Sequence, residues 1–199
     1  MTVVNLKTPI SEEEIRKLLV NDILYLSGTI VTARDQAHKR LIESAKQGKH
    51  LQVNLEGLAI YHCGPVVIQR DSEWRVVAAG PTTSTRMEVY TPDLLKKFKP
   101  RVIIGKGGMA ERTTQALKTY GAIYATFTGG AAVLAAKTIK KVKDVVWPDL
   151  GMPEAMWFLE IEDFGPLVVA IDSHGNNLFQ EVAKIAERNK ELIYNKLGL

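Results

Sequence analysis

Residues 102–108 read Val-Ile-Ile-Gly-Lys-Gly-Gly, and this stretch decides the fold. Three consecutive β-branched apolar residues are typical of a short buried strand, and the glycines after them predict a sharp turn. A helix is expected over about 111–120 and a second strand over 122–127. A strand, a glycine-rich turn, a helix and another strand form a βαβ unit, which predicts a parallel sheet in an α/β fold.

The segments on either side of this unit alternate between strand-like and helix-like patterns. Upstream we expect a helix that starts at a Ser11 capping box, a strand over 22–32 with a bulge at Gly28, and a helix over 33–46. The other expected elements are strands over 59–62, 66–69, 75–79, 157–161 and 167–171, a helix that starts at 91–95, and helices over 129–137 and 177–193. No repeat, low-complexity tract or linker is visible, so residues 1–199 are expected to form a single α/β domain with mixed sheets.

The composition is that of an ordinary globular protein. The chain has 199 residues, of which 46% are hydrophobic and 24% charged, which suits one hydrophobic core. Residues 1–6 and the acidic run 12–14 lack the basic and apolar regions of a secretory signal. Apolar stretches such as 167–171 are far shorter than the roughly 20 residues that cross a bilayer. We therefore expect a soluble, cytoplasmic protein with no membrane contact.

The cysteine and histidine residues restrict the metal chemistry of the chain. Cys63 is the single cysteine, so the chain can form no internal disulfide and cannot by itself hold an iron–sulfur cluster. Any such cluster must come from another chain. The histidines are far apart and lack the spacing of a metal motif, so no metal site is expected; they are His38, His50, His62 and His174.

The net charge of +4 raises the question of nucleic-acid binding. Lysines gather over 96–101 and 137–143, and both clusters are predicted to lie at helix ends, where cations favour the helix dipole and face water. No zinc-finger or RNA-recognition signature accompanies them. We expect no nucleic-acid partner, and the positive charge is compatible with a small anionic substrate.

Three segments at the ends of expected strands combine small or hydroxyl residues with a cation: 32–35, 80–87 and 105–109. Ligands of α/β proteins bind at such strand ends. A guanidinium fork matches a carboxylate, and glycines let a backbone approach a ligand closely. The three cations Arg34, Arg86 and Lys106 would together suit a small dicarboxylate.

Other interpretations of these segments stay open. A turn or a solvated surface arginine explains the first two equally well, but Lys106, between glycines directly after an apolar strand, has no helical face to solvate. Asp35 and His38 are interpreted as first-turn helix residues and left out of the site. Cys63 is a weak candidate nucleophile, because its neighbour His62 would point to the opposite face of a strand.

The glycine-rich segment Gly105 to Ala110 also has to be compared with phosphate-binding motifs. It fits the G-x-G-x-x-A dinucleotide fingerprint, but the next strand, which ends near Phe127, carries no acidic residue for a ribose hydroxyl. It is not a P-loop, because Lys106 is followed by glycine rather than serine or threonine.

Several of these segments resemble a known family. The segments Gly28-Thr-Ile-Val-Thr-Ala-Arg-Asp-Gln-Ala-His-Lys-Arg40, Gly80-Pro-Thr-Thr-Ser-Thr-Arg-Met87 and Ile104-Gly-Lys-Gly-Gly-Met109 are similar to the C-terminal region of class I fumarases and to the β subunit of L-tartrate dehydratase. Residues 61–65 and 172–179 also match, so the resemblance covers nearly the whole chain. It implies a swivelling β/β/α fold and an active site shared with a partner α subunit, which binds a [4Fe–4S] cluster through three cysteines.

The resemblance also implies roles for individual residues. Arg34, Arg86 and Lys106 would bind the substrate carboxylates, and Thr82 would be the catalytic base that removes the C3 proton. A threonine hydroxyl is a very weak base unless nearby cations stabilise its alkoxide, which Arg86 and Lys106 are expected to do. The open iron of the partner's cluster would act as Lewis acid on the departing hydroxyl.

The function implied is that of a hydro-lyase β subunit, active only in a hetero-oligomer with the α subunit and able to form a homodimer when alone. It would hydrate fumarate reversibly to malate, a reaction of the citric acid cycle, or dehydrate tartrate. Two alternatives stay open. One is a non-catalytic module that binds a dicarboxylate or supports assembly, and the other is a nucleotide-binding enzyme that uses the loop from Gly105 to Ala110.

Overall fold

The computed structural model describes residues 1–48, 51 and 53–197. The strands are β1 (Val3–Lys7), β2 (Ile23–Thr32), β3 (Ala59–Tyr61), β4 (Val66–Arg70), β5 (Glu73–Ala78), β6 (Val102–Gly105), β7 (Ile123–Thr126), β8 (Ile139–Val146) and β9 (Met156–Ile171). The helices are α1 (Glu12–Ile15), α2 (Asp35–Lys46), α3 (Thr91–Phe98), α4 (Glu111–Tyr120), α5 (Ala132–Thr138) and α6 (Leu178–Leu197). Two short 3₁₀ helices cover Ser84–Met87 and Pro148–Leu150.

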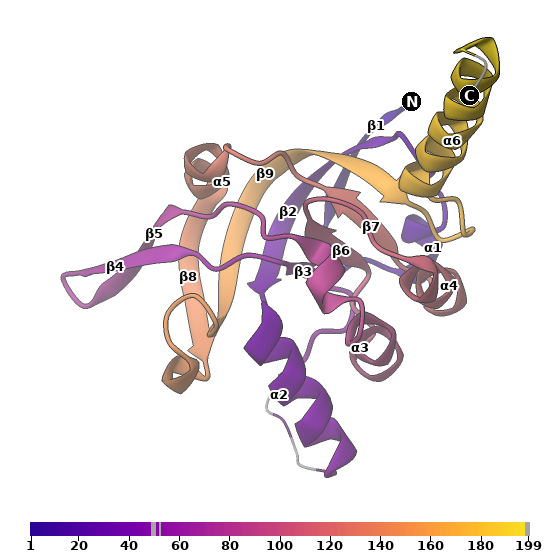
Figure 1. The fold of residues 1–199 in the computed structure, drawn as a ribbon. Coiled ribbons are helices and arrows are strands. Elements are labelled where there is room, and N and C mark those ends of the chain that lie inside the picture. Colours follow the sequence, from indigo (N-terminus) through magenta and orange to yellow (C-terminus); the bar gives the residue numbers. More distant parts are fainter. Residues whose placement is uncertain (49–50, 52, 198–199) are drawn as a thin grey trace.

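A closed ring of strands forms the centre of the molecule (Figure 1). The main sheet has the order β1-β2-β3-β6-β7-β9-β8, and β9 also pairs with β2. This additional pairing closes β2, β3, β6, β7 and β9 into a barrel-like sheet, while β4 and β5 form a separate hairpin. The structure is therefore a mixed α/β fold built on a five-stranded barrel.

The predicted βαβ unit is confirmed as β6, α4 and β7. β6 pairs in parallel with β7, with Val102 beside Ile123, and β3 pairs in parallel with β6 on the other side. Every residue of β6 is buried. Because side chains alternate along a strand, Ile104 faces the barrel interior and Ile103 faces the layer under the helices. Burial on both faces explains the uninterrupted apolar run.

The prediction of two strands over 157–161 and 167–171 is wrong, because β9 is one continuous strand. Both halves pair antiparallel with β2, from Val31 opposite Phe158 to Leu24 opposite Leu167. The turn-like residues 163–166 lie where the register shifts, near Leu26 and Gly28. A glycine followed by a proline usually ends a strand, so these residues suggested a break. A bulge accommodates both of them, and β9 therefore continues.

Strand β8 also differs from expectation. The lysines around 137–143 were predicted at the end of a helix, but Lys140, Lys141 and Lys143 lie on β8 at the edge of the main sheet. Charged side chains on an edge strand oppose pairing with other chains, so this pattern suits an edge as well as a helix end. The other cluster follows the prediction, because Lys96 and Lys97 occupy the last turn of α3.

The C-terminal helix is confirmed, but its apolar stripe is not covered. The side-chain oxygen of Asn177 accepts hydrogen bonds from the backbone N–H groups of Phe179 and Gln180, as expected of a cap. Val182, Ile185 and Ile193 on α6 are all at least half exposed. Figure 1 shows α6 extending away from the barrel. Separately, no helix in the described part of the chain is both long and apolar enough to cross a membrane.

Tyr61 connects the barrel interior to the segment after β5. Its ring packs edge-on against Phe127 and Phe164, with centroids 6.4 and 5.2 Å away. Its hydroxyl donates a 2.7 Å hydrogen bond to the carbonyl of Ala79, which directly follows β5. Tyr61 and Ala79 are both fully buried, so no water could take the place of the hydroxyl if it were removed.

We expect Tyr61→Phe to lower the free energy of unfolding by about 1–2 kcal/mol, because it leaves the buried Ala79 carbonyl without its donor. Urea unfolding followed by circular dichroism measures the change. Tyr25→Phe is the matched control, since Tyr25 is partly exposed, and should change the value by less than about 0.5 kcal/mol. Equal effects of the two substitutions would contradict this role of Tyr61.

Candidate active site at the strand ends

The carboxyl ends of three parallel strands lie side by side and carry the predicted residues. Thr32, Tyr61 and Ile104 are neighbours across β2, β3 and β6. The chain continues from these strands into Arg34, His62 and Lys106, respectively. This is the edge at which α/β sheets bind ligands.

A segment from Thr82 to Ser84 is held across this edge by backbone hydrogen bonds. The N–H of Thr82 donates to the carbonyl of His62 at 2.7 Å, and the N–H of Lys106 donates to the carbonyl of Thr82 at 3.2 Å. The N–H of Ser84 then donates to the carbonyl of Lys106 at 3.0 Å. Thr82 therefore lies between the ends of β3 and β6, beside Lys106.

Arg86 lies next to Thr82 and is held by a carboxylate. Its Nε and Nη2 donate to the two oxygens of Asp35 at 3.1 and 2.8 Å, a bidentate pair. Its Nη2 also lies 3.4 Å from the Thr82 hydroxyl oxygen. Asp35 is not among the residues predicted for the site, and the structure places its carboxylate against Arg86. No local pattern could reveal the contact, because 51 residues separate Asp35 from Arg86.

Arg34 also has an internal carboxylate partner. It precedes α2 in an extended conformation, and its Nε lies 3.3 Å from an oxygen of Glu154. A Cβ atom on Gly64 would lie only 2.6 Å from Arg34 Nη1, so the glycine makes room for the guanidinium. Glu154 is a second acidic residue that the sequence did not indicate.

Lys106 differs from the two arginines. Its side chain is exposed and forms no ion pair with any residue in the described ranges. It lines a hollow of about 490 Å³, whose other walls are mostly apolar and include Phe127, Leu134 and Phe179. Neither arginine lines this hollow. A single pocket shared by all three cations therefore stays a prediction. The substrate-binding roles of the cations and the catalytic role of Thr82 also stay predictions.

Two buried histidines support the site from below. His38 Nδ1 lies 2.8 Å from the Arg34 carbonyl and must donate, because a carbonyl only accepts. His62 Nδ1 lies 2.9 Å from the Ser84 hydroxyl, and the two imidazole rings are 5.1 Å apart. Burial lowers the pKa of His38 to about 4 and the pKa of His62 well below its usual value. Both rings are therefore neutral at pH 7.

Gly105, the last residue of β6, makes room for the contact between Ser84 and His62. A Cβ atom on Gly105 would collide with the Ser84 hydroxyl, which would break its contact with His62. Gly107, in contrast, has a φ of +73° and open space where a side chain would point. Of the three glycines in this turn, Gly107 is the one that leaves room for a ligand.

The nucleotide interpretation of this loop meets a physical obstacle. A phosphate would bind at the start of α4, but the carboxylate of Glu88 already occupies that position. Its oxygens accept from the backbone N–H groups of Ala110 and Thr113 at 2.9 and 3.0 Å, and from the Thr113 hydroxyl at 2.8 Å. A bound phosphate would have to displace a negative side chain.

The remaining cysteine and histidines are the other candidates for metal binding or nucleophilic chemistry. Cys63 is buried, and burial raises the pKa of its thiol to about 12, which disfavours the reactive thiolate. His174 is exposed and contacts the Arg16 carbonyl, and His50 lies outside the described residues. Within the described ranges, no three His, Cys, Asp or Glu side chains are grouped as metal ligands would be.

Comparison with known proteins shows the family to which this chain belongs. The model of the family "Fumarase C-terminus" matches residues 1–182. The L(+)-tartrate dehydratase subunit beta of Escherichia coli (strain K12) is 41% identical over 189 residues, which are 94% of this chain and 92% of that protein. This chain belongs to the fumarase C-terminus family.

Two further relatives differ in length and name. The putative L(+)-tartrate dehydratase subunit beta of Methanocaldococcus jannaschii is 43% identical over 186 residues, covering 92% of this chain and 95% of that protein. The putative fumarate hydratase class I of Geobacillus stearothermophilus is 46% identical over 183 residues, covering 92% of this chain but 34% of that protein. The chain thus corresponds to a whole protein in one case and to about a third of one in the other.

The buried His38 predicts a loss of stability in acid. In the unfolded chain a histidine takes up a proton near pH 6.5, whereas folded His38 does so only near pH 4. Between these values the unfolded state binds more protons, so stability falls as pH falls, by roughly 3 kcal/mol in full. Urea unfolding at several pH values tests this. His38→Asn should make the slope between pH 6.5 and 4 shallower, with His62 causing the remainder, and an unchanged slope would refute the assignment.

Proposed function

We propose that this chain is the β subunit of a two-subunit iron–sulfur hydro-lyase, a cytoplasmic enzyme that hydrates fumarate reversibly to malate or dehydrates tartrate. Residues 1–199 would act as one domain of the swivelling β/β/α type. The observation that carries the proposal is the position of Thr82. Its hydroxyl oxygen lies 3.4 Å from Arg86 Nη2, and its backbone carbonyl accepts a hydrogen bond from the N–H of Lys106. Family membership supports the reaction class.

The proposal assigns the substrate carboxylates to Arg34, Arg86 and Lys106. A planar guanidinium binds a carboxylate through two parallel hydrogen bonds, and a lysine adds a point charge. Asp35 accepts hydrogen bonds from Nε and Nη2 of Arg86, and Nη1 is the nitrogen of this guanidinium that remains available to a ligand. In this role Asp35 is a positioning residue, because it fixes the plane of the guanidinium.

Thr82 would hold or move the proton at C3 of the substrate. In the dehydration direction its oxygen accepts this proton, and in the hydration direction its O–H returns it. The oxygen can do so only where positive charge stabilises the alkoxide, and Arg86 is the nearest cation. Asp35 offsets part of that charge, so the proposal needs Lys106, whose backbone N–H bonds to the Thr82 carbonyl, as a second cation beside the base.

The single cysteine of this chain does not fit the thiolate set of a [4Fe–4S] cluster. Cys63 is also buried with a raised pKa, unlike a metal-bound thiolate. We therefore assign the cluster to a partner α subunit. When bound there, the cluster would supply a Lewis-acidic iron for the departing hydroxyl.

Reconstitution tests the proposal. The chain is purified alone, mixed anaerobically with the α subunit encoded beside it, and assayed for iron, sulfide, fumarate hydration and tartrate dehydration. We expect activity only in the mixture. Turnover by the iron-free single chain would overturn the two-subunit assignment, and an inactive mixture that still binds dicarboxylate would favour a binding or assembly module. Comparing kcat/KM for the two substrates identifies the preferred one.

We expect Lys106→Met to reduce turnover of the reconstituted enzyme by at least about 100-fold, because it removes a charged contact to the reacting substrate. The methionine keeps most of the side-chain volume, so folding should survive. Lys96→Met, an exposed lysine on α3, is the matched control and should leave activity unchanged. Activity within a few-fold of wild type would make Lys106 an ordinary surface residue.

Asp35→Asn tests the positioning of Arg86. We expect kcat to fall by about tenfold with a smaller change in KM, since a neutral amide holds the guanidinium less firmly. Asp149→Asn is the control. Asp149 pairs at 2.7 Å with Arg40, which lies on α2 as Asp35 does, but this pair includes none of the residues proposed for catalysis. In an Arg86→Gln background the Asp35 substitution should cost nothing further. Additive losses would show that Asp35 does not act through Arg86.

A further inference from the structure

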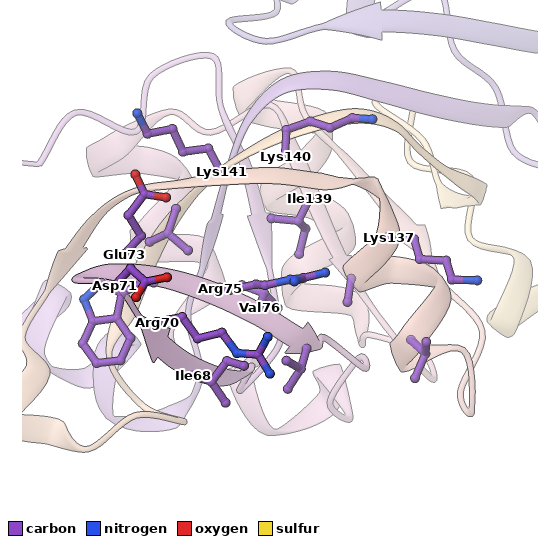
Figure 2. A pocket seen from close by; sticks show the side chains of 15 residues that line it. Ile68, Arg70, Asp71, Glu73, Arg75, Val76, Lys137, Ile139, Lys140 and Lys141 are labelled. Carbon is purple, nitrogen blue, oxygen red and sulfur yellow. The ribbon is translucent and has the colours of Figure 1, made fainter.

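A second hollow, larger than the one beside Lys106, lies between the β4–β5 hairpin and the elements α5 and β8 (Figure 2). Its volume is about 1070 Å³. We call it the basic groove. Its lining residues include Arg70 and Arg75 on the hairpin, Lys137 on α5, and Lys140 and Lys141 on β8. None of the residues proposed for catalysis lines it.

The charges of the basic groove are not balanced within the chain. Five cations line it against two carboxylates, Asp71 and Glu73. Lys140 pairs with Glu162 at 2.7 Å. The other four cations take part in no ion pair within the described ranges, and all are exposed. The groove therefore has a local excess of positive charge, which attracts an anionic partner.

The walls of the groove are strand edges as well as side chains. β5 pairs only with β4, and β8 pairs only with β9, among the described residues. Consecutive residues of each strand line the groove, 73–77 of β5 and 139–142 of β8. Because alternate residues point to opposite faces of a strand, an uninterrupted run means that the edge itself borders the groove. Edges of this kind offer backbone donors and acceptors to an added strand.

Apolar side chains lie among the cations. Trp74 and Val77 are each 37% exposed, and Val133 on α5 is 59% exposed. Trp74 packs edge-on against Trp157, 5.4 Å away, so its ring is already partly engaged. Single-stranded nucleic acids bind through several free aromatic rings on which bases stack, and Trp74 is the one aromatic residue among those that line this groove. Backbone edges with interspersed apolar and basic side chains favour a polypeptide.

We propose that the basic groove binds an acidic segment of a partner protein in extended conformation, with acidic side chains on the groove cations and the segment's backbone pairing with β5 or β8. The groove and the candidate active site are connected along the chain, because the segment 79–81 joins β5 to Thr82. Ala132 of α5 accepts a hydrogen bond from the N–H of Ala79 at 2.9 Å. A segment docked here would contact β5 and α5, which flank the start of the segment that leads to Thr82.

A labelled peptide tests this proposal. The probe alternates glutamate and valine over about eight residues, enough to pair along one strand edge, and its binding to the full chain is followed by fluorescence anisotropy. We expect Arg75→Glu/Lys141→Glu to weaken binding by at least about tenfold, because it reverses two groove charges. The control Lys96→Glu/Lys97→Glu makes the same charge change on α3 and should leave binding nearly unchanged. Thermal unfolding verifies that both variants fold.

Two further probes separate a docked strand from simple charge attraction. A peptide of the same sequence with N-methylated backbone amides cannot pair as a strand and should bind at least about tenfold more weakly. An oligothymidylate of equal charge should also bind more weakly than the unmodified peptide. The proposal is overturned if the unmodified peptide does not bind, if N-methylation has no effect, if the α3 control weakens binding equally, or if the oligothymidylate binds more tightly.

Discussion

The alignment of three parallel strand ends is the constraint on which the candidate site depends. Thr82 has no strand of its own, and its position comes from backbone hydrogen bonds to His62 and Lys106. These bonds form only if β3 and β6 end at the same level, which their parallel pairing ensures. The buried contact between His62 and Ser84 holds the segment from Thr82 to Ser84 against the ends of these strands, and Gly105 leaves space for the Ser84 hydroxyl. The position of Arg86 beside Thr82 follows from the same arrangement.

The candidate site combines two buried, neutral histidines with arginine side chains that are paired with carboxylates. The buried histidines lie under the arginine segments without adding charge, because burial keeps their pKa values low. Asp35 holds the guanidinium of Arg86 through two hydrogen bonds, and Glu154 forms an ion pair with Arg34. Such partly exposed pairs contribute little to stability, so orientation of the guanidinium groups is the more important consequence.

Strong local patterns predicted their elements well, and long-range pairing explains the failures. The apolar run before Gly105 and the helix over 111–120 have the predicted bounds because burial on both faces and helical periodicity are visible within a few residues. β9 was divided in the prediction because a Gly-Pro pair usually ends a strand, whereas pairing with β2 carries this strand through. The lysines of β8 suit a helix end and a sheet edge equally well, and only pairing with β9 distinguishes the two.

From the sequence alone follow the α/β class, the βαβ unit and the lack of cysteines for a cluster, and the same patterns suggested the three cations of the candidate site. These features depend on residue type and on spacing over short distances. Only the tertiary structure decided the closure of the barrel, the pairing of Asp35 with Arg86, the placement of Glu88 at the start of α4, and the basic groove. Each of these contacts joins residues far apart in the chain, and they meet only because strand pairing brings distant segments to the same edge.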